Sequence, residues 1–409
     1  MLSCLSILIL GLLLAFPALA VEGASAGLLL WFNVVLPTLA PFMICTRMVS
    51  VLGAERLLIR PFYPLIHGIL GFSEPGSYVL LCGLLCGYPL GARLCAEKLK
   101  SKEISLSEAR CLLATANHPS PMFLLGFVNR QVVRVFEHPG LSSSLSASSS
   151  LPFSYFPWLI PLCLYLPVIP LSFLARHFYQ FEKRDSQDSQ NFQDLQNPQN
   201  PQKHQEHREH QKDQVQVHPQ VHQKTHPSSD HRDGNPSSNP SGVSVEDAIF
   251  STAHTMVLIG GWIMLFSILA KWVQTIPYFS PPIKAILGGI AEITTGIPLL
   301  CSAFSGSPTL CLILVTLCVA FGGGSGIFQT RSVLLANATE RTMQDKQKNA
   351  GLSIRHYILW KALHALLATG TLIFLLWILP ELERVLPAVP ALLQQAHWIL
   401  LQRAHCGLL

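Results

Sequence analysis

The sequence predicts an all-α polytopic membrane protein with roughly eight transmembrane helices, some of them broken or re-entrant, arranged in two halves. Three observations predict this fold class. First, of the 409 residues 50% are hydrophobic and only 12% are charged, with a mean hydropathy of +0.39, whereas soluble domains are about 25% charged. Second, apolar runs of membrane-spanning length recur along the chain. Third, one long polar stretch separates the runs into two groups.

The apolar runs are the predicted spans, since a bilayer core about 30 Å thick needs about 20 apolar residues in a helix. They lie at residues 3–20, 27–50, 77–93, 111–128, 152–175, 250–273, 285–304, 308–328 and 356–379. The first run ends in small residues, Ala18-Leu19-Ala20, as a signal-peptidase site does, but no Lys or Arg precedes it. We therefore expect an uncleaved first span, with a cleaved signal peptide as the alternative.

The polar stretch at residues 176–243 is rich in Gln, His, Asn, Asp, Ser and Pro. Such a composition cannot bury enough apolar surface to offset the entropy of ordering it. We expect a disordered linker between an N-terminal membrane half, 1–175, and a C-terminal half, 244–380. His204, His207 and His210 could bind a divalent metal, although a solvated linker is the simpler interpretation. Residues 381–409 are predicted to form an amphipathic tail with Trp398 at headgroup depth, with a frayed soluble tail as the alternative.

Lys and Arg clusters predict the orientation, because positive loops face the cytoplasm. One cluster lies in each half, and we expect both inside the cell: Arg93, Lys98, Lys100, Lys102 and Arg110, then Arg331, Arg341, Lys346, Lys348, Arg355 and Lys361. The second cluster lies inside only if the segment 285–304 enters and leaves on the same side. The sequence therefore predicts a re-entrant segment there.

Several classes of function are disfavoured by the sequence. The net charge of +5 does not gather on a soluble face that could bind nucleic acid, and there is no phosphate loop, HExxH or GxSxG motif. Cys82 and Cys86 lie one helical turn apart and could hold a soft metal, but packing as small apolar residues is the simpler interpretation. We predict no enzymatic activity, no cofactor and no metal site.

Breaks in the apolar runs are the most informative positions. Irregular backbone at membrane depth survives only where protein covers it or water fills a cavity. The glycines and proline of the principal breaks are Gly87, Pro89 and Gly91 in the first half and Gly322, Gly323 and Gly324 in the second. Matching breaks in two halves are typical of transporters with internal repeats, although Gly and Pro are also common in membrane helices for packing reasons.

Glu292 is the clearest functional candidate, because an ionisable residue inside an apolar run must find partners or water. Thr295 lies one turn further along, on the same face of the expected helix. A purely structural carboxylate, bonded to nearby backbone and hydroxyl groups, is the alternative. We predict a solute or coupling-ion site from these two residues and from polar residues at the breaks, namely Asn117, Ser120, Ser325 and Gln329.

Several stretches resemble a known family, in the same order along the chain from about residue 27 to 375. They are LWFNVVLP at 30–37, CGYPLGA at 86–92, ANHPSPMFLLG at 116–126, EITTG at 292–296 and FGGGSGIFQ at 321–329. They resemble the sporulation integral membrane proteins with nucleoside-recognition Gate domains. The resemblance implies two Gate-like regions, the first at about 27–130. It also implies a spore-forming bacterium, a cell or spore membrane location and a part in forming the spore envelope, notably the cortex.

The Gate domain is similar to parts of concentrative nucleoside transporters and ferrous-iron transport proteins. The resemblance therefore implies passage of a small solute, a nucleoside-like one among the candidates. The chain departs from the family pattern at its long linker and at His118 and Pro119, which puts the shape of that turn in question. The alternative function is a scaffold in the lipid bilayer that binds other spore membrane proteins without transporting anything.

Overall fold

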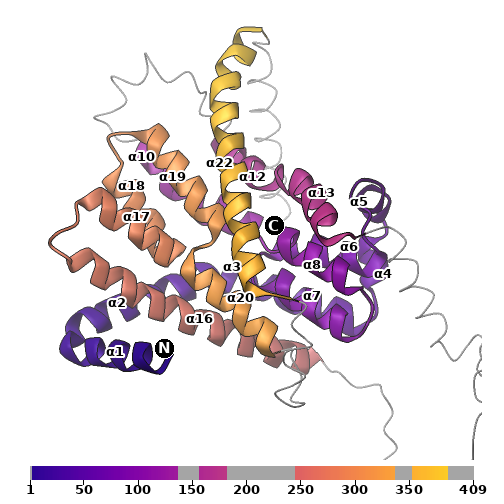
Figure 1. The fold of residues 1–409 in the computed structure, drawn as a ribbon, viewed down its shortest axis with the longest axis horizontal. Coiled ribbons are helices and arrows are strands. Elements are labelled where there is room, and N and C mark those ends of the chain that lie inside the picture. Colours follow the sequence, from indigo (N-terminus) through magenta and orange to yellow (C-terminus); the bar gives the residue numbers. More distant parts are fainter. Residues whose placement is uncertain (1, 137–155, 182–244, 337–351, 386–409) are drawn as a thin grey trace, which may run out of the picture.

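The computed structural model describes residues 2–136, 156–181, 245–336 and 352–385. These residues form helices joined by short turns, without a strand (Figure 1). The all-α prediction is confirmed. The predicted linker disorder, the linker histidines and the amphipathic tail beyond residue 385 lie outside the described residues.

The first half begins with helices on either side of a π-helix, followed by short helices. Their bounds are α1 Leu2–Ala15, α2 Pro17–Leu30, η1 Trp31–Val35, α3 Leu36–Val51, α4 Glu55–Ile59, α5 Tyr63–Leu70, α6 Glu74–Cys86, α7 Leu90–Lys100, α8 Leu106–Thr115, α9 Pro121–Phe123, η2 Leu124–Val128, α10 Asn129–Phe136, α12 Phe156–Tyr165 and α13 Val168–Tyr179. The second half comprises α16 Val245–Thr275, α17 Pro281–Ala291, α18 Ile293–Ala303, α19 Pro308–Phe321, α20 Gly323–Ala336 and α22 Ile354–Val385.

Five helical segments of the described chain are long and apolar enough to cross a membrane. They are Pro17–Val51, Trp158–Tyr179, Val245–Thr275, Pro308–Leu335 and Ile354–Leu379, and a sixth arises if α5 and α6, bent by 101°, count as one span. This number is below the roughly eight expected, because runs such as 77–93 and 285–304 are divided into shorter helices at their breaks.

The N-terminal boundaries also differ from expectation. The sequence predicted separate spans at 3–20 and 27–50, but α1 ends at Ala15, and Pro17 begins α2. Proline suits the first turn of a helix, where its missing N–H is not needed. From there α2, η1 and α3 continue as one span to Val51.

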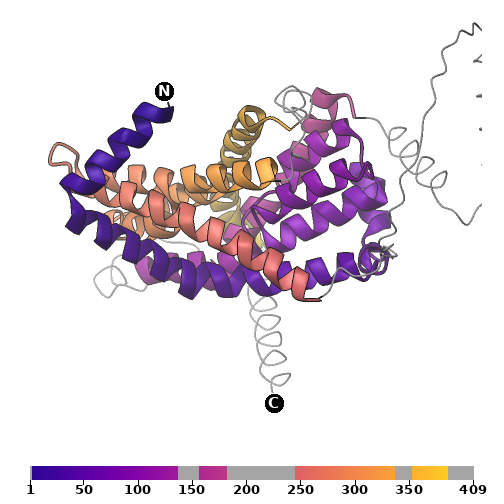
Figure 2. The same ribbon diagram turned by 90° about the horizontal axis from the view of Figure 1, so that it is seen from below.

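Small residues allow α2 to pack closely against α16. A Cβ atom on Gly23 would lie 2.8 Å from the Cα of Ile268, and one on Gly27 would lie 2.7 Å from the Cβ of Ser267. Figure 2 shows α2, α3 and α16 running side by side along the molecule. Glycine at such crossings lets the backbones of membrane helices approach each other. This packing joins the first half to the second.

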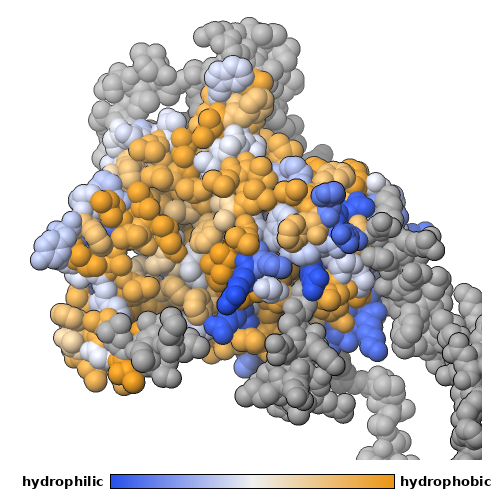
Figure 3. All heavy atoms as spheres, viewed as in Figure 1, coloured by the Kyte–Doolittle hydropathy of each residue, from blue (hydrophilic) through white to orange (hydrophobic). Residues whose placement is uncertain are grey.

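The described surface exposes many large apolar side chains, unlike that of a soluble protein. Large apolar side chains are exposed on the described helices, including Phe32, Val257, Leu359, Leu366 and Trp377, whose exposed fractions range from 62% to 70%. Figure 3 shows apolar side chains over α17, α18, α19 and α22 on the face in view. Such extensive apolar exposure marks a surface that contacts lipid. The buried set, in contrast, contains many polar side chains, among them Glu292, Lys361 and Gln329.

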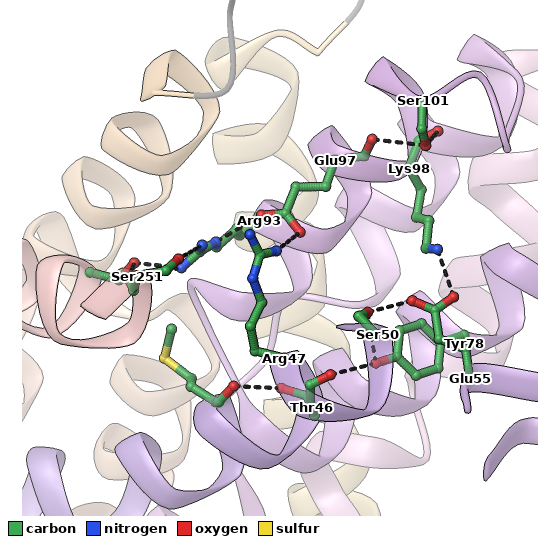
Figure 4. Close-up of polar contacts among 12 residues, drawn as sticks. Thr46, Arg47, Ser50, Glu55, Tyr78, Arg93, Glu97, Lys98, Ser101 and Ser251 are labelled. Carbon is green, nitrogen blue, oxygen red and sulfur yellow. Dashed lines mark hydrogen bonds and ion pairs between the residues drawn. The ribbon is translucent and has the colours of Figure 1, made fainter. Parts of the chain in front are cut away.

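A cluster of charged residues at one end of the bundle joins α3, α4, α7 and α16 (Figure 4). Glu97 accepts hydrogen bonds from Arg47 at 2.8 Å and from Arg93 at 3.0 Å. Arg93 also donates to Thr255 of α16 at 2.6 Å and to Ser251. Lys98 donates to Glu55 at 2.6 Å and to Glu103 at 2.8 Å. This charged cluster therefore connects helices from both halves.

Candidate functional site

The first half contains a helical hairpin whose turn is the predicted break. Helices α6 and α7 fold back on each other around Gly87, and their glycines Gly83 and Gly91 face one another: a Cβ on Gly91 would lie 3.2 Å from the Cα of Gly83. The carbonyl oxygen of Ala116, at the end of α8, fits between them. Gly87 has φ of +84°, a conformation that glycine adopts without steric cost.

The second half contains an equivalent hairpin. Helices α17 and α18 meet at Glu292, and a Cβ on Gly296 would lie 2.2 Å from the Cα of Gly289. This gives segment 285–304 the folded-back shape that a re-entrant segment requires. Helix α19 then ends at Gly322, and α20 begins at once at Gly323; both residues have positive φ, +87° and +66°. In the first half, α8 ends at Thr115 and α9 begins at Pro121. Each half therefore combines one hairpin with one broken helical segment.

The turns of both halves meet around a cavity. It offers about 40 Å³ to the centres of water-sized molecules, which is room for a few waters. Its walls come from η1, α3, the α6–α7 turn, the α8–α9 break, α16, the junction at Glu292 with the start of α18, and α20. The polar lining residues are Thr38, Tyr88, Ser120, Glu292, Thr294 and Gln329.

Glu292 lies at the junction of α17 and α18, where it caps α18. Its backbone is extended, with φ of −148° and ψ of 123°. One carboxylate oxygen, Oε2, accepts hydrogen bonds from the Thr295 N–H at 2.8 Å, from the Thr295 hydroxyl at 3.2 Å and from the Thr294 hydroxyl. The side chain also lines the cavity. Glu292 thus stabilises the helix terminus and contributes a carboxylate to the cavity wall.

This geometry corrects the expected relation between Glu292 and Thr295. The sequence placed them on one face of a continuous helix, but the helix is interrupted at Glu292. They meet through N-capping, and the residue that lines the cavity is Thr294, which was not among the predicted site residues. The threonine pair after a capping glutamate does not itself reveal which of the two points into a cavity.

The other predicted site residues divide into two groups. Ser120 and Gln329 line the cavity, and Ser120 also caps α9 by accepting from the N–H of Phe123 at 3.2 Å. Ser325 and Asn117 are buried but are not among the lining residues. Ser325 supports Gln329, whose Nε2 donates to its hydroxyl at 2.8 Å.

Asn117 joins three elements behind the cavity. Its Oδ1 accepts from the N–H of Ala92 at 3.3 Å, and its Nδ2 donates to Thr330 at 3.0 Å and to Tyr357 at 2.8 Å. These contacts connect the α8–α9 break to α7, α20 and α22. Asn117 is therefore a positioning residue in this arrangement, and neither Thr330 nor Tyr357 was identified from the sequence.

Lys361 is a second correction. The sequence placed it in a cytoplasmic cluster of basic residues, but it lies within α22 and is only 1% exposed. Its Nζ donates to the carbonyl of Asn117 at 3.3 Å and lies 5.8 Å from the centre of the Tyr88 ring. Tyr88 thus separates this lysine from the cavity.

The described residues contain no group of three or more His, Cys, Asp or Glu side chains suited to a metal ion. Cys82 and Cys86 are buried in α6 as free thiols. Both pack in the hydrophobic core of the first half.

Comparison with known proteins finds similarity to a membrane protein of sporulation. The chain is similar to the sporulation integral membrane protein YlbJ of Bacillus subtilis (strain 168), with 23% identity over 338 residues that cover 78% of this chain and 72% of YlbJ. This confirms the resemblance to the YlbJ-like family. The YlbJ relative is an integral membrane protein by name, and the long apolar helices place this chain in the membrane as well. No family model and no solved structure matches the chain.

Proposed function

We propose that the protein is a YlbJ-like sporulation membrane protein that passes a small polar solute or ion across a bilayer. The cavity between the hairpin turns carries the proposal. Two hairpins and two broken helices converge there, and irregular backbone at membrane depth is typical of solute sites in transporters. No enzymatic activity forms part of this proposal.

The lining favours a neutral or cationic solute. The lining residues include one carboxylate, hydroxyl groups and one amide, but no Lys or Arg. The N-terminal ends of α9 and α18 also face the cavity, with Ser120 and Glu292 as their caps. The partial positive charge of those helix ends is balanced by Glu292. A nucleoside-like solute is larger than the space present, so that its entry requires the turns to separate.

The proposed sporulation role comes from the similarity to YlbJ. The resemblance to sporulation proteins with Gate domains further implies work on the spore envelope, notably the cortex. The paired hairpins and broken helices support the Gate-like interpretation of the two halves. In this proposal, the solute serves envelope assembly.

Replacing Glu292 by Gln tests the proposal, because Gln keeps the shape and the capping oxygen but removes the charge. In the experiment, this chain is expressed in Bacillus subtilis in place of YlbJ. The number of heat-resistant spores and the level of the expressed protein in the membrane are measured. We expect the parent to support spore formation and Glu292→Gln to lower the spore count at an unchanged protein level. Glu22→Gln, at an exposed carboxylate paired with Lys271, is the matched control. Equal spore counts from Glu292→Gln and the parent at equal protein level contradict a role for the cavity.

One observation favours the scaffold as the second candidate. The hydrogen bonds of Glu292 to Thr294 and Thr295 are those of a capping residue, and capping alone explains a buried carboxylate. A scaffold requires packed helices and partner proteins in the spore membranes, but no solute. Two results together support this candidate. Glu292→Gln gives normal spore counts, and the parent chain in lipid vesicles does not change their uptake of small polar solutes or ions.

A further inference from the structure

Helix α22 carries a buried polar stripe beside the cavity. Tyr357, Lys361 and His364 follow one another at spacings of four and three residues, which places them on one helical face. Their exposed fractions are 2%, 1% and 0%. The segment Ile354–Leu379 is otherwise apolar enough to span a membrane. Ionisable side chains at such positions are costly and mark functional sites by default.

Lys361 has few partners for an ammonium group. An ammonium has three N–H donors, whereas the hydrogen bond that Lys361 makes is the 3.3 Å contact to the Asn117 carbonyl. Within the described part of the chain, its Nζ forms no ion pair with a carboxylate; the ion pairs there involve other lysines and arginines. The ammonium form is costly to bury with so few partners, and the neutral amine is still a buried polar group with few hydrogen bonds. Because both forms carry a cost, the group is suited to proton exchange.

His364 has geometry suited to a bound proton. Its Nε2 lies 2.8 Å from the carbonyl oxygen of Leu164, and its Nδ1 lies 3.4 Å from that of Ala320. A neutral imidazole has one N–H and can donate to one of these oxygens, whereas an imidazolium donates to both. The two carbonyls, from α12 and α19, can thus accept from an imidazolium, whereas burial and the nearby Lys361 oppose a second positive charge on the ring.

His118 provides a second imidazole in contact with the first. The two rings lie 4.0 Å apart between centres. Neither nitrogen of His118 has a hydrogen bond of acceptable geometry, although the Thr115 carbonyl lies nearby. His118 is fully buried at the α8–α9 break, two residues from Ser120 of the cavity. It is an open acceptor next to two proton-binding groups.

The surrounding charges limit the cluster to few protons. Lys361 interacts electrostatically with both His118 and His364, and positive charges at such distances in a low dielectric repel each other. The facing titratable groups are Tyr88 from the α6–α7 turn and Tyr357 from α22. Glu292 interacts electrostatically with Tyr88, the tyrosine that lies over Lys361. Helices α8, α12 and α19 supply the carbonyls described above.

We propose that Lys361, His364 and His118 form a proton-binding site, and that the proton held there is the coupling ion for the cavity. Two elements belong to both sites: Tyr88 lies over Lys361 and lines the cavity, and the turn from Asn117 to Ser120 contacts Lys361 at one end and the cavity at the other. If binding of a proton displaces the lysine or the imidazoles, Tyr88 and the turn from Asn117 to Ser120 shift with them, and both line or border the cavity. The coupling role rests on the proposed transport function, whereas proton binding does not.

The test of proton binding uses the full-length chain in lipid bilayers, labelled with ¹⁵N at lysine side chains and followed by NMR as the pH varies. We expect one lysine signal to convert between amine and ammonium in the pH range over which the protein stays folded and the other lysines stay charged. Lys361→Met removes this signal, and Lys271→Met, at a partly exposed lysine paired with Glu22, leaves it. If all lysines remain ammonium, or the titrating signal survives in Lys361→Met, the proposal is overturned.

His118→Gln tests whether the three residues act together. Removing a neighbouring basic group changes the pH at which the Lys361 signal converts, because the two groups interact electrostatically. If the Lys361 signal converts at the same pH in His118→Gln and in the parent, the three residues do not form one site. If Lys361→Met does not fold, His118→Gln and the parent spectrum still decide between these outcomes.

A second measurement separates coupling from proton binding. We expect Lys361→Met to lower the heat-resistant spore count at normal protein level, and Lys271→Met to leave it unchanged. A titrating Lys361 with normal spore counts from Lys361→Met contradicts the coupling role. Normal counts from Glu292→Gln instead contradict the proposed function, and leave the NMR result on proton binding as it is.

Discussion

Gly91 packs directly against the carbonyl oxygen of Ala116, so that a Cβ atom on Gly91 would lie 1.9 Å from that oxygen. The contact joins the α6–α7 hairpin to the end of α8, immediately before the break that carries Asn117 and Ser120. The Cα of Gly91 and the carbonyl oxygen of Ala116 both belong to the backbone, so neither can rotate away as a side chain could. The position of the cavity wall therefore depends on the absence of a side chain at residue 91.

We expect Gly91→Ala to lower the free energy of unfolding by about 1–3 kcal/mol, the usual cost of forcing extra volume into a packed interior. The measurement is thermal unfolding of the purified protein in detergent. Gly261→Ala is the matched control, since Gly261 lies in helix α16 and a Cβ there meets nothing within 4 Å. Alanine at that position should stabilise the helix by up to about 1 kcal/mol. Equal unfolding temperatures for Gly91→Ala and the parent contradict the close packing.

The sequence predicted where the helices break because glycine and proline act locally. Gly87 and Gly322 stand at residues whose positive φ a side chain disfavours, and Glu292 had to find partners wherever it lay. Ser120 and Gln329 were found because polar residues at breaks have little choice but to face one another or a cavity. These inferences required no knowledge of the tertiary arrangement.

The positions that the sequence did not reveal depend on how distant elements pack. Lys361 follows Arg355 in a basic segment, and nothing local distinguishes a loop lysine from one buried against the Asn117 carbonyl. Tyr88 and Thr38 line the cavity because α3 and the α6–α7 turn come together in space. The number of long spans was overestimated for the same reason: hydropathy does not separate a crossing helix from a hairpin arm.

The charged cluster provides a prediction about stability away from the cavity. Lys98 has a side chain 11% exposed and pairs with Glu55 and Glu103. Lys98→Met leaves two partly buried carboxylates without their cation, and should lower the free energy of unfolding by about 1–2 kcal/mol. Lys100→Met, at an exposed residue of the same helix, is the control and should cost little. Similar losses from both variants would show that the pairs do not stabilise the fold.

The pH dependence of the Lys98 contribution follows from its pKa. Burial lowers the pKa of Lys98, but the hydrogen bonds and charges of Glu103 and Glu55 more than compensate, leaving it above the ordinary value of 10.5. For a group whose folded-state pKa is raised, the stabilisation is complete below the unfolded-state pKa and is lost only as the pH rises through the folded-state pKa. The difference between Lys98→Met and the parent should therefore stay constant from about pH 7 to 9.

The last prediction separates the two roles of Glu292, which caps α18 and also lines the cavity. Glu292→Ala removes the cap and should lower the free energy of unfolding by about 1 kcal/mol, as loss of an N-cap usually does. Glu292→Gln keeps a side-chain oxygen for the N–H of Thr295 and should unfold close to the temperature of the parent.

The unfolding temperatures of Glu292→Gln and Glu292→Ala decide how a lower spore yield of the Gln variant is interpreted. If Glu292→Gln unfolds like the parent while Glu292→Ala unfolds earlier, any loss of spore yield in the Gln variant comes from the missing charge and not from a weakened helix terminus. If both variants unfold equally early, the ionised carboxylate itself holds α18 in place, and the charge has a structural role that explains its burial without a solute.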